Sequence, residues 1–266
     1  MIFAIAPAIA PVVGGWILLV GPWPWIFWFL VVFGALMAVA TAGILPETHP
    51  RERRTPLRVG PLLHGLWEVA RLPAFLRIAL AGTFGFAGQF VYIVAAPIFV
   101  VDLLGLGPQD FWIFFVPTIA CMVLGAYLSG KAAGRIDPGA LATIGLTIAA
   151  GAGLLNVVLQ AMPGLAPLPW ALVGPALMAL GIALVFPVLQ LAMLDLFPHR
   201  RGAASSVGSF ITLMINSVLA GVVSPLVTGT RLELAVTSLV FVVLGWTLWA
   251  WHQRRSLTSP KVIDGR

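Results

Sequence analysis

The chain has 266 residues, of which 60% are hydrophobic and only 9% are charged, and its mean hydropathy is +1.04. An average soluble domain is about half apolar and about one-quarter charged, so this composition excludes a water-soluble fold. The net charge of +6 does not indicate a nucleic-acid partner, because the basic residues lie in short gaps between apolar runs.

Eight runs of the chain are long and apolar enough to span a membrane, since a spanning helix needs about 20 such residues. We predict spans at residues 1–21, 25–45, 77–101, 111–130, 140–162, 168–194, 203–226 and 234–251. Prolines within them, such as Pro97, Pro117 and Pro187, predict kinked helices. No segment of about ten residues alternates apolar with polar residues, so the predicted fold class is an all-α polytopic membrane protein.

The positions of Lys and Arg predict how the spans are oriented, because short cytoplasmic loops keep positive charge. One predicted side holds the arginines between residues 51 and 71, two basic pairs in later loops, and the basic C-terminal tail. The opposite loops carry only Arg231. We therefore expect the basic side to be the cytoplasm, with both termini inside a plasma membrane.

The longest gap between spans divides the chain into two spans and then six. We predict that residues 1–46 are the last two helices of an N-terminal bundle, 47–76 a basic cytoplasmic linker, 77–252 a six-helix C-terminal bundle and 253–266 a cytoplasmic tail. Many transporters pair two bundles around a site at the membrane midplane. The two-plus-six arrangement therefore predicts a transporter of this kind that lacks four helices.

Part of the linker has a pattern of its own. Between Pro61 and Arg71, the apolar residues Leu62, Leu66 and Val69 fall broadly on one helical face. This pattern is typical of a helix that lies on the membrane surface, but a disordered linker is an equal alternative.

The first span holds Pro7, Pro11, Gly14 and Gly15. Prolines and small residues at this density bend a helix and let another helix approach closely. The order resembles the antiporter motif in the fifth helix of major facilitator drug exporters, although Ala10 replaces the glycine that precedes the motif's proline.

Two basic loops resemble further motifs of the same superfamily. The first resembles the cytoplasmic loop motif after the eighth helix, and the second resembles the stretch that opens the eleventh helix. We predict that their residues contact helix ends and close a cytoplasmic gate, and plain anchoring by positive charge is the alternative. The gate candidates are Gly130, Lys131, Arg135, Arg200, Arg201 and Gly202.

These motifs occur in the order found in the bicyclomycin-resistance (Bcr/CflA) type of drug/proton antiporters, and the resemblance covers the chain from Met1 to about His252. It implies export of small amphipathic compounds through a bacterial inner membrane by alternating access of two six-helix bundles. The proton gradient supplies the energy, without a cofactor. We expect a monomer when the protein is complete, and a fragment here that lacks the first four helices.

Proton coupling requires an ionisable group inside the membrane. The bodies of the eight predicted spans contain no Asp, Glu, Lys or His. Exporters of this type are thought to carry their protonatable carboxylate in the first helices of the N-terminal bundle, so we expect the coupling residue to lie outside this sequence.

Uncharged polar residues within the spans are the candidates for substrate contact. An amide in hydrocarbon needs partners, so it either joins helices or lines a wet cavity. Asn156 and Gln160 lie near an outer loop, which favours joining helices. For the cavity candidates both roles stay open, and these are Gln89, Tyr92, Gln190 and Asn216. Phe90, Phe115 and Phe186 either stack on aromatic substrates or pack in the core.

Two other hypotheses belong to different classes. The chain is alternatively a truncated, transport-inactive membrane remnant that only folds or associates with partner membrane proteins. An intramembrane enzyme would need a nucleophile and an acid or base at membrane depth, and the spans lack such a charged partner. The single cysteine, Cys121, has no neighbouring His or Cys, so we expect neither a metal site nor an enzyme.

Overall fold

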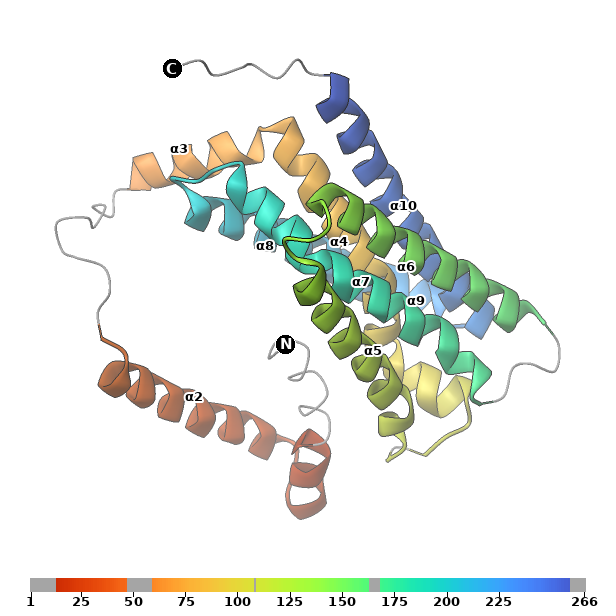
Figure 1. The fold of residues 1–266 in the computed structure, drawn as a ribbon. Helices are drawn as coiled ribbons and strands as arrows, with labels where there is room; N and C mark the ends of the chain where they lie inside the picture. Colours follow the sequence, from red (N-terminus) through yellow and green to blue (C-terminus); the bar gives the residue numbers. More distant parts are fainter. Residues whose placement is uncertain (1–12, 47–58, 108, 163–167, 259–266) are drawn as a thin grey trace, which may run out of the picture.

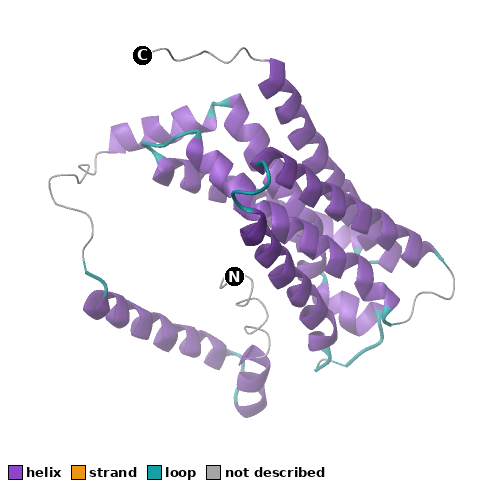
Figure 2. Ribbon diagram, in the orientation of Figure 1, coloured by secondary structure: helices purple, strands orange, loops and turns teal. Residues whose placement is uncertain are grey.

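The computed structural model describes residues 13–46, 59–107, 109–162 and 168–258 (Figure 1). In these ranges every regular element is helical, which confirms the all-α prediction (Figure 2). Seven helical segments of the described chain are long and apolar enough to cross a membrane. Of the first predicted span, residues 13–20 are helical and residues 1–12 lie outside the described residues, so an eighth span stays a prediction.

After the helix at 13–20, the helices and helical turns of the described chain follow in this order. Their bounds are α2 (Pro24–Ile44), α3 (Val59–Ala70), α4 (Pro73–Val94), the π-helical turn η2 (Ile98–Leu103), α5 (Phe111–Ala132), α6 (Pro138–Ala161), α7 (Trp170–Asp195), α8 (Arg201–Val218), the π-helical turn η3 (Leu219–Val223), α9 (Ser224–Val227) and α10 (Arg231–Thr258). The segment from α8 to α9 forms one continuous span, Arg201–Val227.

Helices α4 to α10 form a bundle in which α4 and α7 are the central pair. The α10 helix packs along α4 and α6, while α5 and α6 pack against α7, and α8 contacts α3, α4 and α7. The α2 helix buries none of its residues and lies apart from this bundle (Figure 1). The domain boundaries predicted from the sequence stay a prediction.

Proline positions follow the geometry of the helices. Pro73 and Pro138 stand in the first turn of α4 and α6, where the missing N–H has no intrahelical partner to lose. Pro117 and Pro187 lie inside α5 and α7 without ending them. The predicted third span is interrupted, because α4 ends at Val94 and η2 begins directly after Pro97.

Glycines set how closely the helices approach. A Cβ on Gly181 of α7 would lie 2.6 Å from the carbonyl oxygen of Gly145 on α6 and 2.6 Å from the backbone nitrogen of Ala149. A Cβ on Gly245 of α10 would lie 2.6 Å from the backbone nitrogen of Gly85 on α4. Backbones therefore touch at these crossings, which no larger residue permits.

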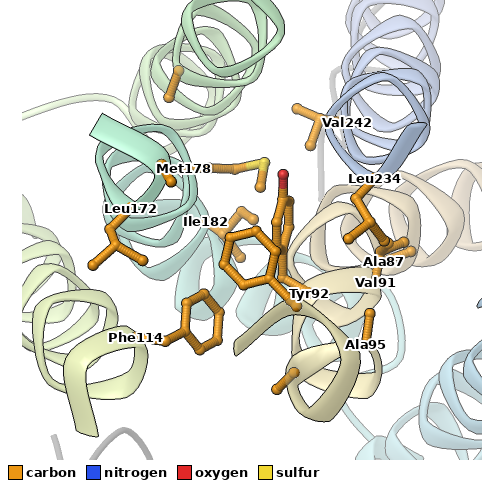
Figure 3. Close-up of a cluster of buried hydrophobic side chains, with 14 of the residues drawn as sticks. Ala87, Val91, Tyr92, Ala95, Phe114, Leu172, Met178, Ile182, Leu234 and Val242 are labelled. Carbon is orange, nitrogen blue, oxygen red and sulfur yellow. The ribbon is translucent and has the colours of Figure 1, made fainter. Parts of the chain in front are cut away.

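Two clusters of buried side chains fill the bundle. One surrounds Tyr92, whose ring centroid lies 5.1 Å from that of Phe99 and 6.3 Å from that of Phe114. Figure 3 shows this tyrosine among side chains from α5, α7 and α10. The other cluster gathers near the start of α4 and includes Phe75 and Leu189.

The sequence allowed either a surface helix or a disordered linker before the third predicted span, and the structure shows a helix from Val59 to Ala70. This α3 helix packs against α8 and α4, and it buries Gly65 and Val69. The apolar face seen in the sequence is therefore used, at Val69, for contact with the bundle.

We predict that Gly181→Leu lowers the free energy of unfolding by about 1–3 kcal/mol, because a larger side chain forces α6 and α7 apart. Gly151→Leu is the matched control, since Gly151 is an exposed glycine of α6 and nothing lies within 4 Å of the position that a Cβ would take there. Thermal unfolding of the purified chain in detergent measures both variants. Equal midpoints would contradict close α6–α7 packing.

Candidate functional site

Two hollows lie side by side on one face of the bundle. The first, the α4–α8 hollow, has a volume of about 290 Å³ and is walled by α4, α7 and α8. The second, the α5–α7 hollow, has a volume of about 410 Å³ and is walled by α5 and α7, with one residue from α4. Together they lie along the middle of α4 and the second half of α7.

Three residues line both hollows: Phe86, Phe186 and Gln190. The ring centroids of Phe86 and Phe186 lie 6.4 Å apart at an interplanar angle of 52°. Phe86 also lies 5.9 Å from Phe90, so aromatic rings continue along α4. The shared wall therefore offers two aromatic rings and one amide to a molecule in either hollow.

Two threonine hydroxyl groups lie in the wall of the α4–α8 hollow. The Thr83 and Thr212 hydroxyl oxygens lie 2.9 Å apart and join α4 to α8. Thr212 also donates to the carbonyl oxygen of Gly208 at 3.1 Å, so Thr83 acts as the donor to Thr212. All of the described residues that line the two hollows are uncharged.

The four predicted cavity residues occupy different environments. Gln190 lines both hollows. Gln89 is 1% exposed, and neither its amide nitrogen nor its amide oxygen has a hydrogen-bond partner. Asn216 is also buried, with an unpartnered side-chain oxygen. Tyr92 is fully buried, and its hydroxyl accepts a hydrogen bond from the Asn156 amide at 2.7 Å.

The Tyr92–Asn156 hydrogen bond joins α4 to α6, which is the role expected for Asn156. Gln160 donates to the Asn156 side-chain oxygen at 3.3 Å and extends the network toward α7. Gly174 of α7 leaves room for the Asn156 side chain, because a Cβ at Gly174 would lie 2.5 Å from Asn156 Cγ. Tyr92 is thus placed in a buried network rather than on the wall of either hollow.

The antiporter-motif residues are only partly described. Pro7 and Pro11 lie outside the described residues. Gly14 and Gly15 belong to the helix at 13–20, and nothing lies within 4 Å of the position where a Cβ would be. The role of this motif in a close helix crossing stays a prediction.

The gate candidates fall into two groups at the same end of the bundle. Gly130, Lys131 and Arg135 are exposed at the connection between α5 and α6. Lys131 lies 5.6 Å from the Tyr127 ring centroid. The turn to α6 passes through Gly134 at φ +76°, a left-handed conformation that favours glycine.

The second group lies at the start of α8. Arg201 pairs with Asp195 at 2.9 Å, and nothing lies within 4 Å of a Cβ on Gly202. Arg200 forms an ion pair with Glu68 of α3, and Glu68 also contacts His64 at 3.2 Å. Sequence reasoning missed Glu68 and His64, because only the docking of α3 on α8 brings them to Arg200. In the sequence, the one sign of this contact was the i, i+4 spacing of His64 and Glu68, in a segment for which a helix and a disordered linker were equal alternatives.

The chain is similar to known membrane transporters. The family model of the Major Facilitator Superfamily matches residues 1–221. This chain belongs to the Major Facilitator Superfamily. A bicyclomycin resistance protein homolog of Haemophilus influenzae is 24% identical over 259 residues, covering 97% of this chain and 65% of the relative. The resemblance to the bicyclomycin-resistance type is thereby confirmed.

Other relatives match over shorter stretches. An uncharacterized MFS-type transporter, YdgK of Bacillus subtilis, is 29% identical and covers 85% of this chain and 56% of its own length. The multidrug transporter MdfA of Edwardsiella piscicida is 27% identical, covering 79% of this chain and 51% of the relative. The chain thus spans between about half and two thirds of the length of these relatives, as a multi-pass membrane protein of the superfamily.

We expect the Tyr92–Asn156 pair to stabilise the bundle, with a coupling energy of about 0.6–2 kcal/mol, as measured for polar pairs between membrane helices. A double-mutant cycle with Tyr92→Phe and Asn156→Leu, read by thermal unfolding in detergent, determines it. Thr147→Val gives a comparison on the outer face of α6, because it removes an exposed hydrogen bond that the Trp246 indole nitrogen donates to the Thr147 hydroxyl at 3.1 Å. Strict additivity of the two variants would contradict a stabilising pair.

Proposed function

We propose that this chain is part of a proton-coupled exporter that moves small amphipathic compounds out across the bacterial inner membrane by alternating access. The observation that carries the proposal is the pair of adjoining hollows with the shared wall of Phe86, Phe186 and Gln190. Family membership and relatives whose names refer to bicyclomycin or multidrug resistance support it.

The lining of the hollows supports a particular substrate chemistry. Aromatic rings bind flat apolar groups by stacking, and an amide with two nearby hydroxyls accepts or donates hydrogen bonds. Since none of the described residues that line the hollows is charged, this part of the path suits uncharged aromatic compounds better than organic cations. A cation would meet aromatic ring faces here, and a carboxylate to pair with it would come from another part of the transporter.

Proton coupling is included in the proposal only because the resemblance to drug/proton antiporters implies it. In the described spans the acidic residues lie at helix ends, as with Asp195 at the end of α7 and Glu233 in the first turn of α10. Such positions are open to solvent and need no change in membrane access to gain or lose a proton. The coupling carboxylate is therefore proposed to lie outside the described spans.

The basic end of the bundle is proposed to face the cytoplasm. Labelling with a membrane-impermeant maleimide tests this in cells, using Cys121→Ala as the background. Gln109→Cys precedes α5 and Ala133→Cys follows it, and both positions are exposed. We expect intact cells to label Gln109→Cys alone, with Ala133→Cys reacting only after lysis. The reverse pattern would overturn the orientation.

Transport itself is tested with the complete reading frame of the gene in cells that lack their own drug exporters. We predict that Phe186→Ala reduces efflux of chloramphenicol, a neutral aromatic compound, by about two- to tenfold, because one stacking contact is lost. We expect Gln190→Ala to act in the same direction. Efflux of the cation ethidium should change less.

Phe210→Ala is the matched control, since Phe210 is an exposed aromatic residue of α8 outside both hollows. Equal effects of Phe186→Ala and Phe210→Ala would remove the hollows from the transport path. If the unaltered protein expels neither compound nor any of a wider panel, the exporter proposal fails and the transport-inactive hypothesis gains.

A further inference from the structure

Arg77 occupies a corner of the bundle that the proposed transport path does not use. It lies one turn after the start of α4, where the last turns of α10 pack against it. Its guanidinium carbon lies 5.3 Å from the ring centroid of Trp251 on α10. Its Nε atom is buried without a hydrogen-bond partner, and none of the ion pairs within the described residues includes Arg77.

His252 supplies a second unpartnered polar atom at this corner. Its Nδ1 is buried and makes no hydrogen bond. The imidazole stacks on Trp249 with ring centroids 5.4 Å apart, and Trp249 is held by a 3.0 Å hydrogen bond from its indole nitrogen to Thr143 of α6. Stacking on Trp249 therefore fixes the histidine ring, and Trp251, the residue before His252, contacts Arg77.

The surroundings of the corner are basic. Arg254 and Arg255 follow on the next turn of α10 and are exposed. On the neighbouring α6, the Asp137 carboxylate caps the helix by accepting the Ala140 N–H at 2.9 Å. This carboxylate is thus engaged at a helix N-terminus, and Arg77 has no ion pair with it.

An apolar track leads away from the corner along α10. Trp251, Leu244 and Val240 are spaced by seven and four residues, so they share one helical face. Their exposed fractions are 48%, 43% and 51%. In a membrane this face contacts acyl chains, while Arg77 and His252 lie near the ends of their spans, where lipid phosphates are found.

We propose that the corner between α4 and α10 binds the phosphate of an anionic membrane lipid. Arg77 donates from its guanidinium, including the unpartnered Nε–H, and His252 contributes a second contact through Nδ1. The lipid's acyl chains lie along the face of Trp251, Leu244 and Val240. A buried arginine donor without a partner is costly, and a phosphate oxygen satisfies it by a charge-assisted hydrogen bond. Basic pockets between membrane helices are suited to lipid head groups for the same reason.

Native mass spectrometry of the detergent-purified 266-residue chain tests this site. Dioleoyl phosphatidylglycerol is titrated against dioleoyl phosphatidylcholine and against inorganic phosphate. We expect selective retention of phosphatidylglycerol, and we expect Arg77→Gln to weaken it by about tenfold through loss of charge-assisted hydrogen bonds. Arg135→Gln is the control, because it removes the same charge from an exposed loop at the same end.

Equal retention by Arg77→Gln and Arg135→Gln would overturn the proposal, since only general surface charge would then matter. Displacement of phosphatidylglycerol by millimolar inorganic phosphate would also overturn it, in favour of a site for a free anion. If Arg77→Gln does not fold, His252→Leu and Trp251→Leu decide the question. Both should weaken phosphatidylglycerol binding several-fold without changing phosphatidylcholine binding, and unchanged binding in both would reject the site.

Discussion

Direct contact between helix backbones is the constraint on which the bundle depends. In a bilayer, lipid tails are as apolar as leucine side chains, so helices associate through close packing and hydrogen bonds between helices. Gly145 meets Gly181 between α6 and α7, and Gly85 meets Gly245 between α4 and α10. These crossings hold α6, α7, α4 and α10 as a dense block. The hollows lie beside this block, on the face that α4 and α7 form with α5 and α8, and Phe86 and Phe186 line both of them.

Polar groups in this block are divided between joining helices and lining the hollows. Tyr92 and Asn156 satisfy each other between α4 and α6, and Ser238 of α10 donates to the Gly88 carbonyl oxygen of α4 at 2.6 Å. Gln190 lies instead on the wall of both hollows. An amide whose partner is another helix stabilises one arrangement of the bundle, whereas an amide on a wall is available to a ligand.

Most basic residues of the described chain, unlike the uncharged polar residues, lie at one end of the bundle. Arg77, Arg200 and Lys131 all lie at one end of the bundle, and each has a different partner: the Trp251 ring, Glu68 of α3, and the Tyr127 ring. Positive charge at this end pairs with α3 and, as proposed, sets the orientation in the membrane and binds lipid. The described lining of the hollows is free of charge, so the charged end of the bundle is distinct from the proposed recognition site in its middle.

The fold class, the superfamily and the approximate positions of the seven described spans could be predicted from the sequence, although the third predicted span, 77–101, ends seven residues beyond α4. This was possible because span length, positive charge in loops and motif order are local properties of the chain. The sequence could not say which of Gln89, Tyr92, Gln190 and Asn216 join helices and which line a cavity, because all four are uncharged polar residues in apolar helices. The tertiary structure was needed to show that Tyr92 accepts a hydrogen bond from Asn156, that Gln190 lines two hollows, and that Glu68 pairs with Arg200. Those contacts depend on the rotation of each helix about its axis and on which helices are neighbours, and both are set by the glycine crossings between helices distant in the chain.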